Sequence, residues 1–290
     1  MSMIKLGIQT NPLKMLKLQE VIEWAARHDV ETLEIPAWPD SKHCKVDQVL
    51  SGHRDEITGP CKKHGIEVTS LVYCTNHLAP DTRESSNSHM KKVIEAASQL
   101  DVSIVACFIG GTGSDLFTEM GLFEEYFLPL VDFAGEHDVR LAVENCPQGG
   151  KNIGMSPYYW REIFEAAEHS PYLGLEFDPS HLVWLHIDYK KALQEFCQSK
   201  KVLTIHAKDT RINDAILIER GILGKGWWEY KIPGSGMIDW NDIFKILNTN
   251  GYTGSMNIEH EDAAYRGNAV KIKEGFQSGL QVLRDIRNGM

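Results

Sequence analysis

Eight short apolar segments alternate with helix-like stretches along this chain. Each segment is rich in Val, Ile, Leu and Thr, as strands that are buried on both faces are. The expected strands are Lys5–Gln9, Thr32–Ile35, Glu67–Tyr73, Ser103–Ile109, Arg140–Glu144, Leu173–Asp178, Leu203–Ala207 and Ser255–Glu259. Eight strand–helix units in 290 residues predict a single α/β domain over residues 1–290, a closed (β/α)8 TIM barrel.

The stretches between these strands have the apolar period of helices. The expected helices are Leu18–His28, Asp47–His64, Asn87–Leu100, Leu122–His137, Ser156–His169, Tyr189–Gln198, Asp239–Asn250 and Val270–Ile286. Gly52, Gly59 and Pro60 predict a break in the second helix, and Pro129 predicts a kink or a late start in the fourth. An open doubly wound sheet is the alternative, but no G-x-G-x-x-G follows the first strand.

One connection is much longer than barrel loops usually are. About 31 residues separate Lys208 from Asp239, and the segment 211–236 is rich in glycine and aromatic residues. Such a loop at the catalytic face predicts a lid. The alternative is a packed excursion that serves stability or an oligomer contact.

Four successive strands end in a metal-ligand type of residue: Glu144, Asp178, His206 and Glu259. The carboxyl ends of barrel strands meet at one face, where active sites of this fold lie. Three carboxylates and one imidazole suit a divalent ion, with Mn²⁺ expected and Mg²⁺, Co²⁺ or Zn²⁺ as alternatives.

Composition limits the partners of this protein. The net charge of −10 disfavours binding to nucleic acid. The six cysteines form no C-x-x-C pair, which indicates reduced structural thiols. Neither a signal-peptide pattern nor a membrane-length apolar run is present, so we expect a cytoplasmic protein that does not bind membranes.

The motifs around the four strand ends resemble those of a known family. The motifs are Glu144-Asn145, Asp178-Pro-Ser-His181, His206-Ala-Lys208-Asp209 and Ile258-Glu259-His-Glu261-Asp262. They are similar to those of xylose isomerase-like TIM barrels, and more narrowly to the sugar phosphate isomerase/epimerase family of tagatose/psicose 3-epimerases and inosose-processing enzymes. The resemblance implies that Glu144, Asp178, His206 and Glu259 are the metal ligands and that the protein is a homodimer or homotetramer.

The resemblance also implies roles for two further residues. At one position the chain differs from the family. His181 would touch substrate or metal-bound water, and Arg211 is the nearest match to an arginine that follows the metal histidine. The epimerases have a second glutamate six residues after the first ligand, where this chain has Gly150. This glycine puts the ketose 3-epimerase assignment in doubt.

A metal next to a ketose carbonyl acidifies the neighbouring C–H, and a ligand carboxylate can take the proton. With Glu144 and Glu259 on opposite sides of the substrate carbon, proton removal and return through a cis-enediolate gives epimerisation, or isomerisation at the adjacent carbon. The expected function is therefore a metal-dependent isomerase/epimerase of a sugar or polyol ketone. The alternative is a lyase that dehydrates an inosose or a 3-keto sugar. Two further hypotheses for the function are an endonuclease IV-like nuclease and a non-catalytic binding barrel.

Further side chains are expected at the mouth of the barrel. Glu34, His77 and Lys208 are predicted to contact the substrate. A structural ion pair is the alternative for Glu34, and a salt bridge with Asp209 is the alternative for Lys208. Trp38 and Trp184 would form apolar walls. Two glycine-rich turns, 110–113 and 233–236, are weak candidates for a phosphate cradle.

Overall fold

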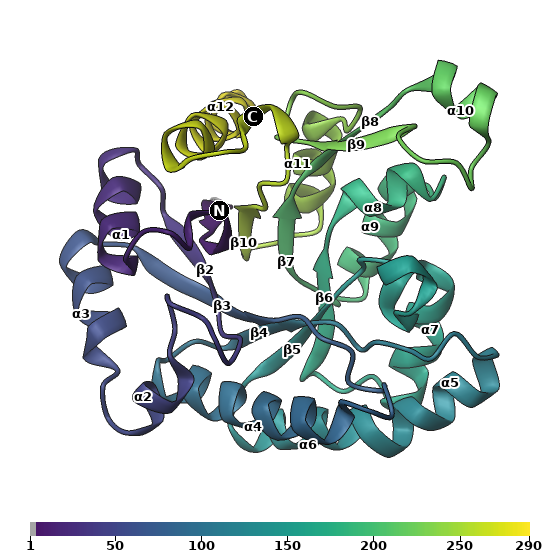
Figure 1. The fold of residues 1–290 in the computed structure, drawn as a ribbon, viewed down its shortest axis with the longest axis horizontal. Helices are drawn as coiled ribbons and strands as arrows, with labels where there is room; N and C mark the ends of the chain where they lie inside the picture. The colour runs from purple at the N-terminus through teal and green to yellow at the C-terminus, as the bar shows by residue number, and fades with distance from the viewer. Residues whose placement is uncertain (1–3) are drawn as a thin grey trace.

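The computed structural model describes residues 4–290 and shows a closed barrel of parallel strands wrapped by helices (Figure 1). The barrel strands are β1 (Lys5–Gln9), β2 (Thr32–Pro36), β3 (Glu67–Tyr73), β4 (Ile104–Cys107), β5 (Arg140–Glu144), β6 (Leu173–Phe177), β7 (Val202–Ala207) and β10 (Ser255–Ile258). Pairing of β1 with both β2 and β10 closes the barrel. The predicted (β/α)8 fold is confirmed.

The helices are α1 (Leu18–Arg27), α2 (Val46–Leu50), α3 (Asp55–His64), α4 (Arg83–Gln99), α5 (Leu116–Leu122), α6 (Leu128–Glu136), α7 (Pro157–Ala166), α8 (Pro179–Trp184), α9 (Tyr189–Gln198), α10 (Asp214–Arg220), α11 (Trp240–Thr249) and α12 (Ala269–Asn288). The second expected helix is divided near Gly52, as predicted, although Pro60 lies inside α3. A π-helical turn, Phe123–Phe127, joins α5 to α6 just before Pro129. Among the described residues, no helix combines the length and apolarity needed to cross a bilayer.

Two strands, β6 and β10, end one residue earlier than predicted, before Asp178 and Glu259 respectively. Asp178 is not the last residue of β6 but the N-cap of α8, and its Oδ1 accepts a hydrogen bond of 2.8 Å from the backbone N–H of Ser180. Asp-Pro-Ser is a helix start, with proline at the first helical position. Glu259 likewise follows β10 directly. Both carboxylates therefore lie on the loops at the carboxyl end of the barrel.

The inside of the barrel is polar. Thr32 Oγ1 donates to Asn257 Oδ1 at 2.8 Å, and Thr204 lies 3.2 Å from Ser255, hydroxyl to hydroxyl. Gly7 faces this layer because a Cβ there would overlap Thr32 and Asn257. Most apolar residues of the strands point outward and pack against the helices, whereas Ile104, Ala142 and Leu203 form a small separate cluster next to the lower end of the barrel. Hydrogen bonds between side chains therefore fill the middle of the barrel.

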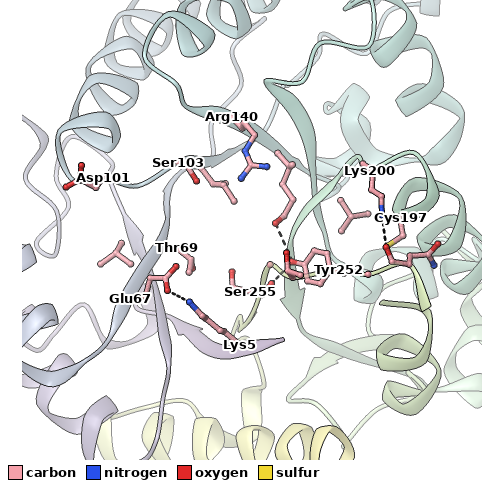
Figure 2. A pocket seen from close by; sticks show the side chains of 18 residues that line it. Lys5, Glu67, Thr69, Asp101, Ser103, Arg140, Cys197, Lys200, Tyr252 and Ser255 are labelled. Atoms are coloured by element: carbon pink, nitrogen blue, oxygen red, sulfur yellow. Dashed lines mark hydrogen bonds and ion pairs between the residues drawn. The ribbon is translucent and has the colours of Figure 1, made fainter. Parts of the chain in front are cut away.

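A pocket of about 480 Å³ lies below this layer, at the amino ends of the strands (Figure 2). Lys5, Arg140, Val202 and Ser255, each the first residue of its strand, contribute to its lining. In TIM barrels the catalytic site lies at the opposite, carboxyl end. The lower pocket is therefore separate from the candidate active site.

The long connection after β7 is an ordered excursion. Strands β8 (Asp209–Ile212) and β9 (Trp228–Lys231) form an antiparallel ribbon, with α10 between them, that projects from the barrel (Figure 1). The indole of Trp228 stacks on Trp184 of α8, with 4.6 Å between ring centroids and 2° between planes. This stack fixes the ribbon against the loop that follows β6.

Asp209 at the start of the ribbon organises the turn that leads into α11. Its carboxylate accepts hydrogen bonds from the backbone N–H groups of Gly234 and Ile238 and from the indole N–H of Trp240, at 3.0–3.1 Å. The glycine-rich turn 233–236 thus surrounds an internal carboxylate and does not form a phosphate cradle. Asp209 does not pair with Lys208, so that alternative for Lys208 is wrong.

We predict that Gly236→Ala destabilises the protein by about 2 kcal/mol, because a Cβ would overlap the fixed Asp209 carboxylate. It would also lie 2.6 Å from the carbonyl oxygen of Thr210. Gly59→Ala is the matched control: Gly59 lies inside α3 with no atom within 4 Å of the new Cβ. That change should stabilise by about 0.5–1 kcal/mol. Urea unfolding measures both, and an unchanged Gly236→Ala variant would contradict the packing argument.

Candidate active site

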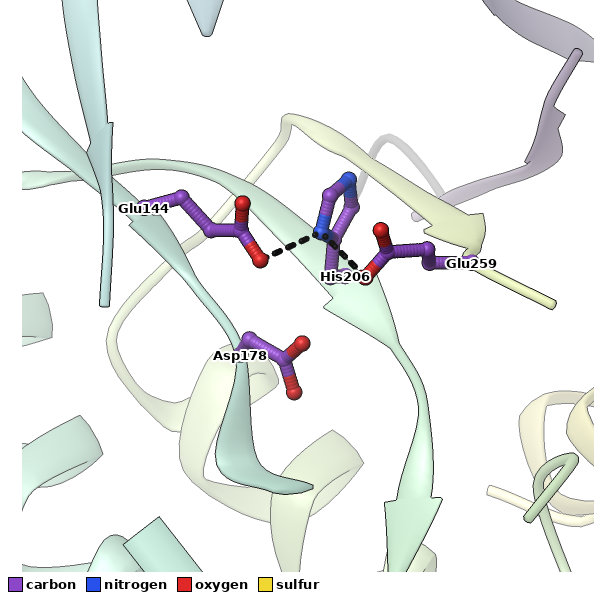
Figure 3. Close-up of side chains that lie close together, drawn as sticks. All are labelled: Glu144, Asp178, His206 and Glu259. Carbon is purple, nitrogen blue, oxygen red and sulfur yellow. Dashed lines mark ion pairs between the residues drawn. The ribbon is translucent and has the colours of Figure 1, made fainter. Parts of the chain in front are cut away.

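The four predicted ligands meet at the carboxyl end of the barrel. One ligand atom from each of Glu144, Asp178, His206 and Glu259 lies within 4.8 Å of all the others. Glu144 Oε1 and Glu259 Oε2 lie 3.4 and 3.3 Å from His206 Nδ1. Figure 3 shows the two glutamates on opposite sides of this imidazole, with Asp178 beside them.

The donor set fits a divalent ion. His206 Nδ1 is buried and has no hydrogen-bond partner among the described residues. Asp178 Oδ2, also buried, lies 3.0 Å from Lys208 Nζ without the geometry of a hydrogen bond. Buried polar atoms without partners are costly unless something binds them. A cation held by three carboxylates and one imidazole would satisfy both atoms.

Lys208 and His181 complete the cluster. The Lys208 ammonium lies 2.5 Å from Glu259 Oε2 and 3.1 Å from Glu261 Oε2. His181 Nε2 lies 3.4 Å from both Glu144 Oε1 and Asp178 Oδ2. Both side chains are only 1% exposed. They supply positive charge and N–H donors beside the carboxylates of the cluster.

A second carboxylate layer lies beneath His206. Glu34 Oε1 accepts a hydrogen bond of 2.7 Å from His206 Nε2, and Glu34 Oε2 accepts one of 2.7 Å from the hydroxyl of Ser70. Glu176 Oε1 lies 3.3 Å from the same imidazole nitrogen. Nε2 donates downward, so Nδ1 is the nitrogen that faces the four-residue cluster. Burial opposes protonation of this imidazole, but the surrounding carboxylates raise its pKa well above its usual range, and a bound cation would replace the Nδ1 proton.

The charges of the cluster follow from burial and from its neighbours. Burial alone would raise the pKa of Glu144, but the hydrogen bond from His181 and the nearby charges of His206 and Lys208 hold that pKa well below its usual range. Burial likewise opposes ionisation of Glu259, yet the charges of Lys208 and His206 lower its pKa to about 2. Burial and the nearby Glu34 charge raise the pKa of Glu176 well above its usual range. Both flanking glutamates are therefore carboxylates at neutral pH.

Tyr230 of the ribbon is a site residue that the strand pattern did not identify. Its hydroxyl lies 2.8 Å from His181 Nδ1 and accepts a hydrogen bond of 3.3 Å from the indole N–H of Trp184. The Lys208 ammonium lies 4.5 Å from the centre of the Tyr230 ring. The excursion therefore borders the cluster through Tyr230, and Trp184 of α8 packs against it.

Three predicted substrate contacts lie elsewhere. Glu34 is fully buried and binds His206. Arg211 is exposed and donates to the backbone carbonyl of Ser235 at 2.7 Å, so its side chain fixes the ribbon. His77 is fully buried, with Nδ1 2.7 Å from Asn87 Oδ1 and its ring against Phe127. The loop after β3 turns His77 toward the helices, away from the cluster.

The second glycine-rich turn also binds an internal carboxylate. Glu119 Oε1 accepts hydrogen bonds of 2.7–2.9 Å from the backbone N–H groups of Thr112, Gly113 and Ser114. Glu119 is only 3% exposed. The turn 110–113 is therefore filled by the protein itself, like the turn that surrounds Asp209.

The sequence profile described as xylose isomerase-like TIM barrel matches residues 22–286. The chain belongs to this family. It is 25% identical to the uncharacterized protein YfiH of Bacillus subtilis, over 97% of this chain and 98% of that protein. It is 23% identical to an inosose dehydratase of Erwinia tasmaniensis, over 77% of each chain.

Solved structures share the fold over nearly the whole chain. A xylose isomerase domain protein from Planctomyces limnophilus has a TM-score of 0.78 at 21% identity and covers 99% of this chain and 98% of its own. The IOLI protein with a bound zinc atom has a TM-score of 0.77 at 19% identity and covers 99% of both chains. D-Psicose 3-epimerase from Clostridium cellulolyticum H10 has a TM-score of 0.71 at 15% identity, covering 98% of this chain and 99% of its own.

We predict that Glu34→Gln weakens binding of a divalent metal about 10- to 100-fold, because an amide no longer holds the His206 N–H as a carboxylate does. Isothermal titration with Mn²⁺ or Zn²⁺ measures this affinity. Ser70→Ala, which removes only the hydroxyl on the other Glu34 oxygen, is the control and should have a smaller effect. Equal affinity of Glu34→Gln and wild type would remove Glu34 from this role.

We also predict that His77 lowers the free energy of unfolding of this protein at acidic pH. Burial lowers the pKa of His77 from 6.5 to about 4. The unfolded chain therefore binds more protons between these values, and stability falls as the pH drops through this window. His77 should make the free energy of unfolding about 2 kcal/mol smaller at pH 5 than at pH 7.5.

Urea unfolding at both pH values tests this contribution, with His77→Gln as the comparison. The variant should lose that part of the pH dependence, whatever its stability at pH 7.5. A pH dependence as steep as that of wild type would show that His77 is not its source.

Proposed function

We propose that this protein is a divalent-metal-dependent isomerase or epimerase of a sugar or polyol ketone. The placement of two ionised glutamates on opposite sides of His206 Nδ1 carries this proposal. A divalent ion held by Glu144, Asp178, His206 and Glu259 would polarise a substrate carbonyl and acidify the neighbouring C–H. The carboxylate-rich donor set favours Mn²⁺, and Zn²⁺ can use the same ligands.

The two glutamates would move the proton. Glu144 Oε2 and Glu259 Oε1 are the oxygens turned away from His206, so each can act as a base while its other oxygen binds metal. One glutamate removes the proton beside the carbonyl to give an enediolate. The other, once it has taken up a proton from water, returns that proton to the opposite face, which inverts that carbon, and the first glutamate then releases its proton to water.

Room for a substrate lies beside Glu259. A pocket of about 510 Å³ adjoins this residue and is lined by Gln9, Asn11, Lys14 and Arg266, among others. The side chain of Glu259 is 17% exposed, against 5% for Glu144. A polyol chain in this pocket would meet amide and ammonium donors. Lys208 and His181 would hold the oxygens at the reacting carbons, and the ribbon would cover the bound substrate.

Dehydration is the second candidate reaction. Gly150, at the position where the epimerases have their second glutamate, lies on an exposed turn and contributes no side chain. An enzyme without that carboxylate can remove the same proton and then expel a β-hydroxyl, with His181 or Lys208 donating the proton that the leaving oxygen needs. Similarity to an inosose dehydratase supports this alternative.

We predict that Glu144→Gln and Glu259→Gln each lower solvent exchange at the reacting carbon by about 10²- to 10⁴-fold. The assay incubates the metal-loaded protein with ketoses, inososes and 3-keto sugars in D₂O and reads deuterium uptake by mass spectrometry. A product of equal composition indicates isomerisation or epimerisation, whereas loss of water indicates a lyase.

The control is Glu195→Gln, which removes a solvent-exposed ion pair with Arg161. Metal content is measured for every variant, so that loss of metal is not mistaken for loss of a base. A variant that binds metal and retains full exchange removes that glutamate from the proton-transfer role. No uptake in wild type with any member of the panel would reject the proposed reaction for these substrates.

A further inference from the structure

The lower pocket of the barrel contains an arginine without an acidic partner. Arg140 is the first residue of β5 and is half-buried. Its guanidinium forms no hydrogen bond or ion pair with any described residue, and Figure 2 shows it pointing into the space enclosed by the pocket. Arginine presents its N–H donors in a planar fork that matches phosphate and carboxylate groups.

The acids of this pocket are already paired. Glu67 forms a close ion pair with Lys5. Asp101 lies 2.6 Å from Arg54. The remaining cation of the lining, Lys200, donates to the backbone carbonyl of Asn250 at 2.7 Å and has no acidic partner. In a chain with a net charge of −10, the pocket therefore has an excess of positive charge.

Neutral donors complete the lining. Ser103 and Thr253 have hydroxyls without a hydrogen-bond partner among the described residues, and Ser103 lies close to Arg140 in Figure 2. Hydroxyls beside a guanidinium are a common setting for an anionic group that also carries oxygen acceptors. A volume of about 480 Å³ suits a small metabolite.

The pocket is separate from the metal cluster. Arg140 and Glu144 are the two ends of β5, about 13 Å apart along the strand. The hydrogen-bonded layer of Thr32, Asn257 and Thr204 lies between the two ends of the barrel. A ligand below this layer therefore does not touch the proposed catalytic residues.

We propose that the lower pocket binds a small anion with a phosphate or carboxylate group, and that Arg140 is its main donor. The site is independent of the reaction proposed for the upper end. Inorganic phosphate and malonate are the probes, because they present the two anionic groups without other chemistry. A stronger response to one of them identifies the anionic group that the pocket prefers.

Isothermal titration of the metal-loaded protein, at constant ionic strength in NaCl, should show saturable binding of at least one probe. Arg140→Gln should lower its affinity about tenfold or more, and Arg140→Lys should lower it less. Glu67→Gln should raise the affinity several-fold, because it frees Lys5 to face the anion. This gain would show that the positive charge of the lining sets the affinity of the pocket.

Lys14→Gln, at the upper pocket, is the matched control and should bind as wild type does. Removal of metal with a chelator should also leave binding unchanged. The proposal is overturned if neither probe binds saturably, if Arg140→Gln binds as wild type, or if Lys14→Gln or chelation abolishes binding. The last two results would place the anion at the upper site.

Discussion

The upper half of this barrel depends on keeping several buried carboxylates at one point. Glu34, Glu144, Asp178 and Glu259 all lie within ion-pair distance of His206, His181 or Lys208. Like charges at such separations repel strongly in a site with little water, so each carboxylate needs a cation or a donor. The protein supplies one lysine and two imidazoles. A divalent ion would balance the remaining charge, and burial of His206 Nδ1 without a partner points to the same position.

This requirement also explains the layers of the site. His206 can present Nδ1 upward only if Nε2 has an acceptor below, and Glu34 provides that acceptor. Glu34 in turn is held by Ser70. Tyr230 holds His181 from the opposite side, and the Trp184–Trp228 stack holds the ribbon that carries Tyr230. The chemistry at the mouth thus depends on a strand residue beneath it and on an excursion above it.

The sequence predicts the parts of this arrangement that follow from strand order. Glu144, Asp178, His206 and Glu259 lie at or next to the carboxyl ends of neighbouring strands, and the parallel barrel brings such ends together whatever the details of packing. The strand pattern did not identify Glu176, and Glu34 was expected to contact the substrate, although each lies two residues from a residue that faces the same side, Asp178 and Thr32 respectively. Tyr230 was not predictable in this way, because its contact with His181 depends on how a ribbon folds across 49 residues. His77 and Arg211 do not lie at the predicted position beside the cluster, for a related reason. Both follow the end of a barrel strand, where the path of the connecting segment decides what a side chain contacts.

In this protein an unpaired cation is a better indication of ligand binding than a glycine-rich turn. The turns at 110–113 and 233–236 present backbone N–H groups as anion-binding nests do. In both, however, a buried carboxylate of the same chain accepts those hydrogen bonds. Such a turn is complete without a ligand, and Gly236 is needed to admit the Asp209 carboxylate. Arg140 differs because no acceptor of the described chain reaches its guanidinium, while the acids around it are already paired. The hydrogen bonds of the two turns are therefore complete within the chain, whereas the guanidinium of Arg140 still has donors without an acceptor.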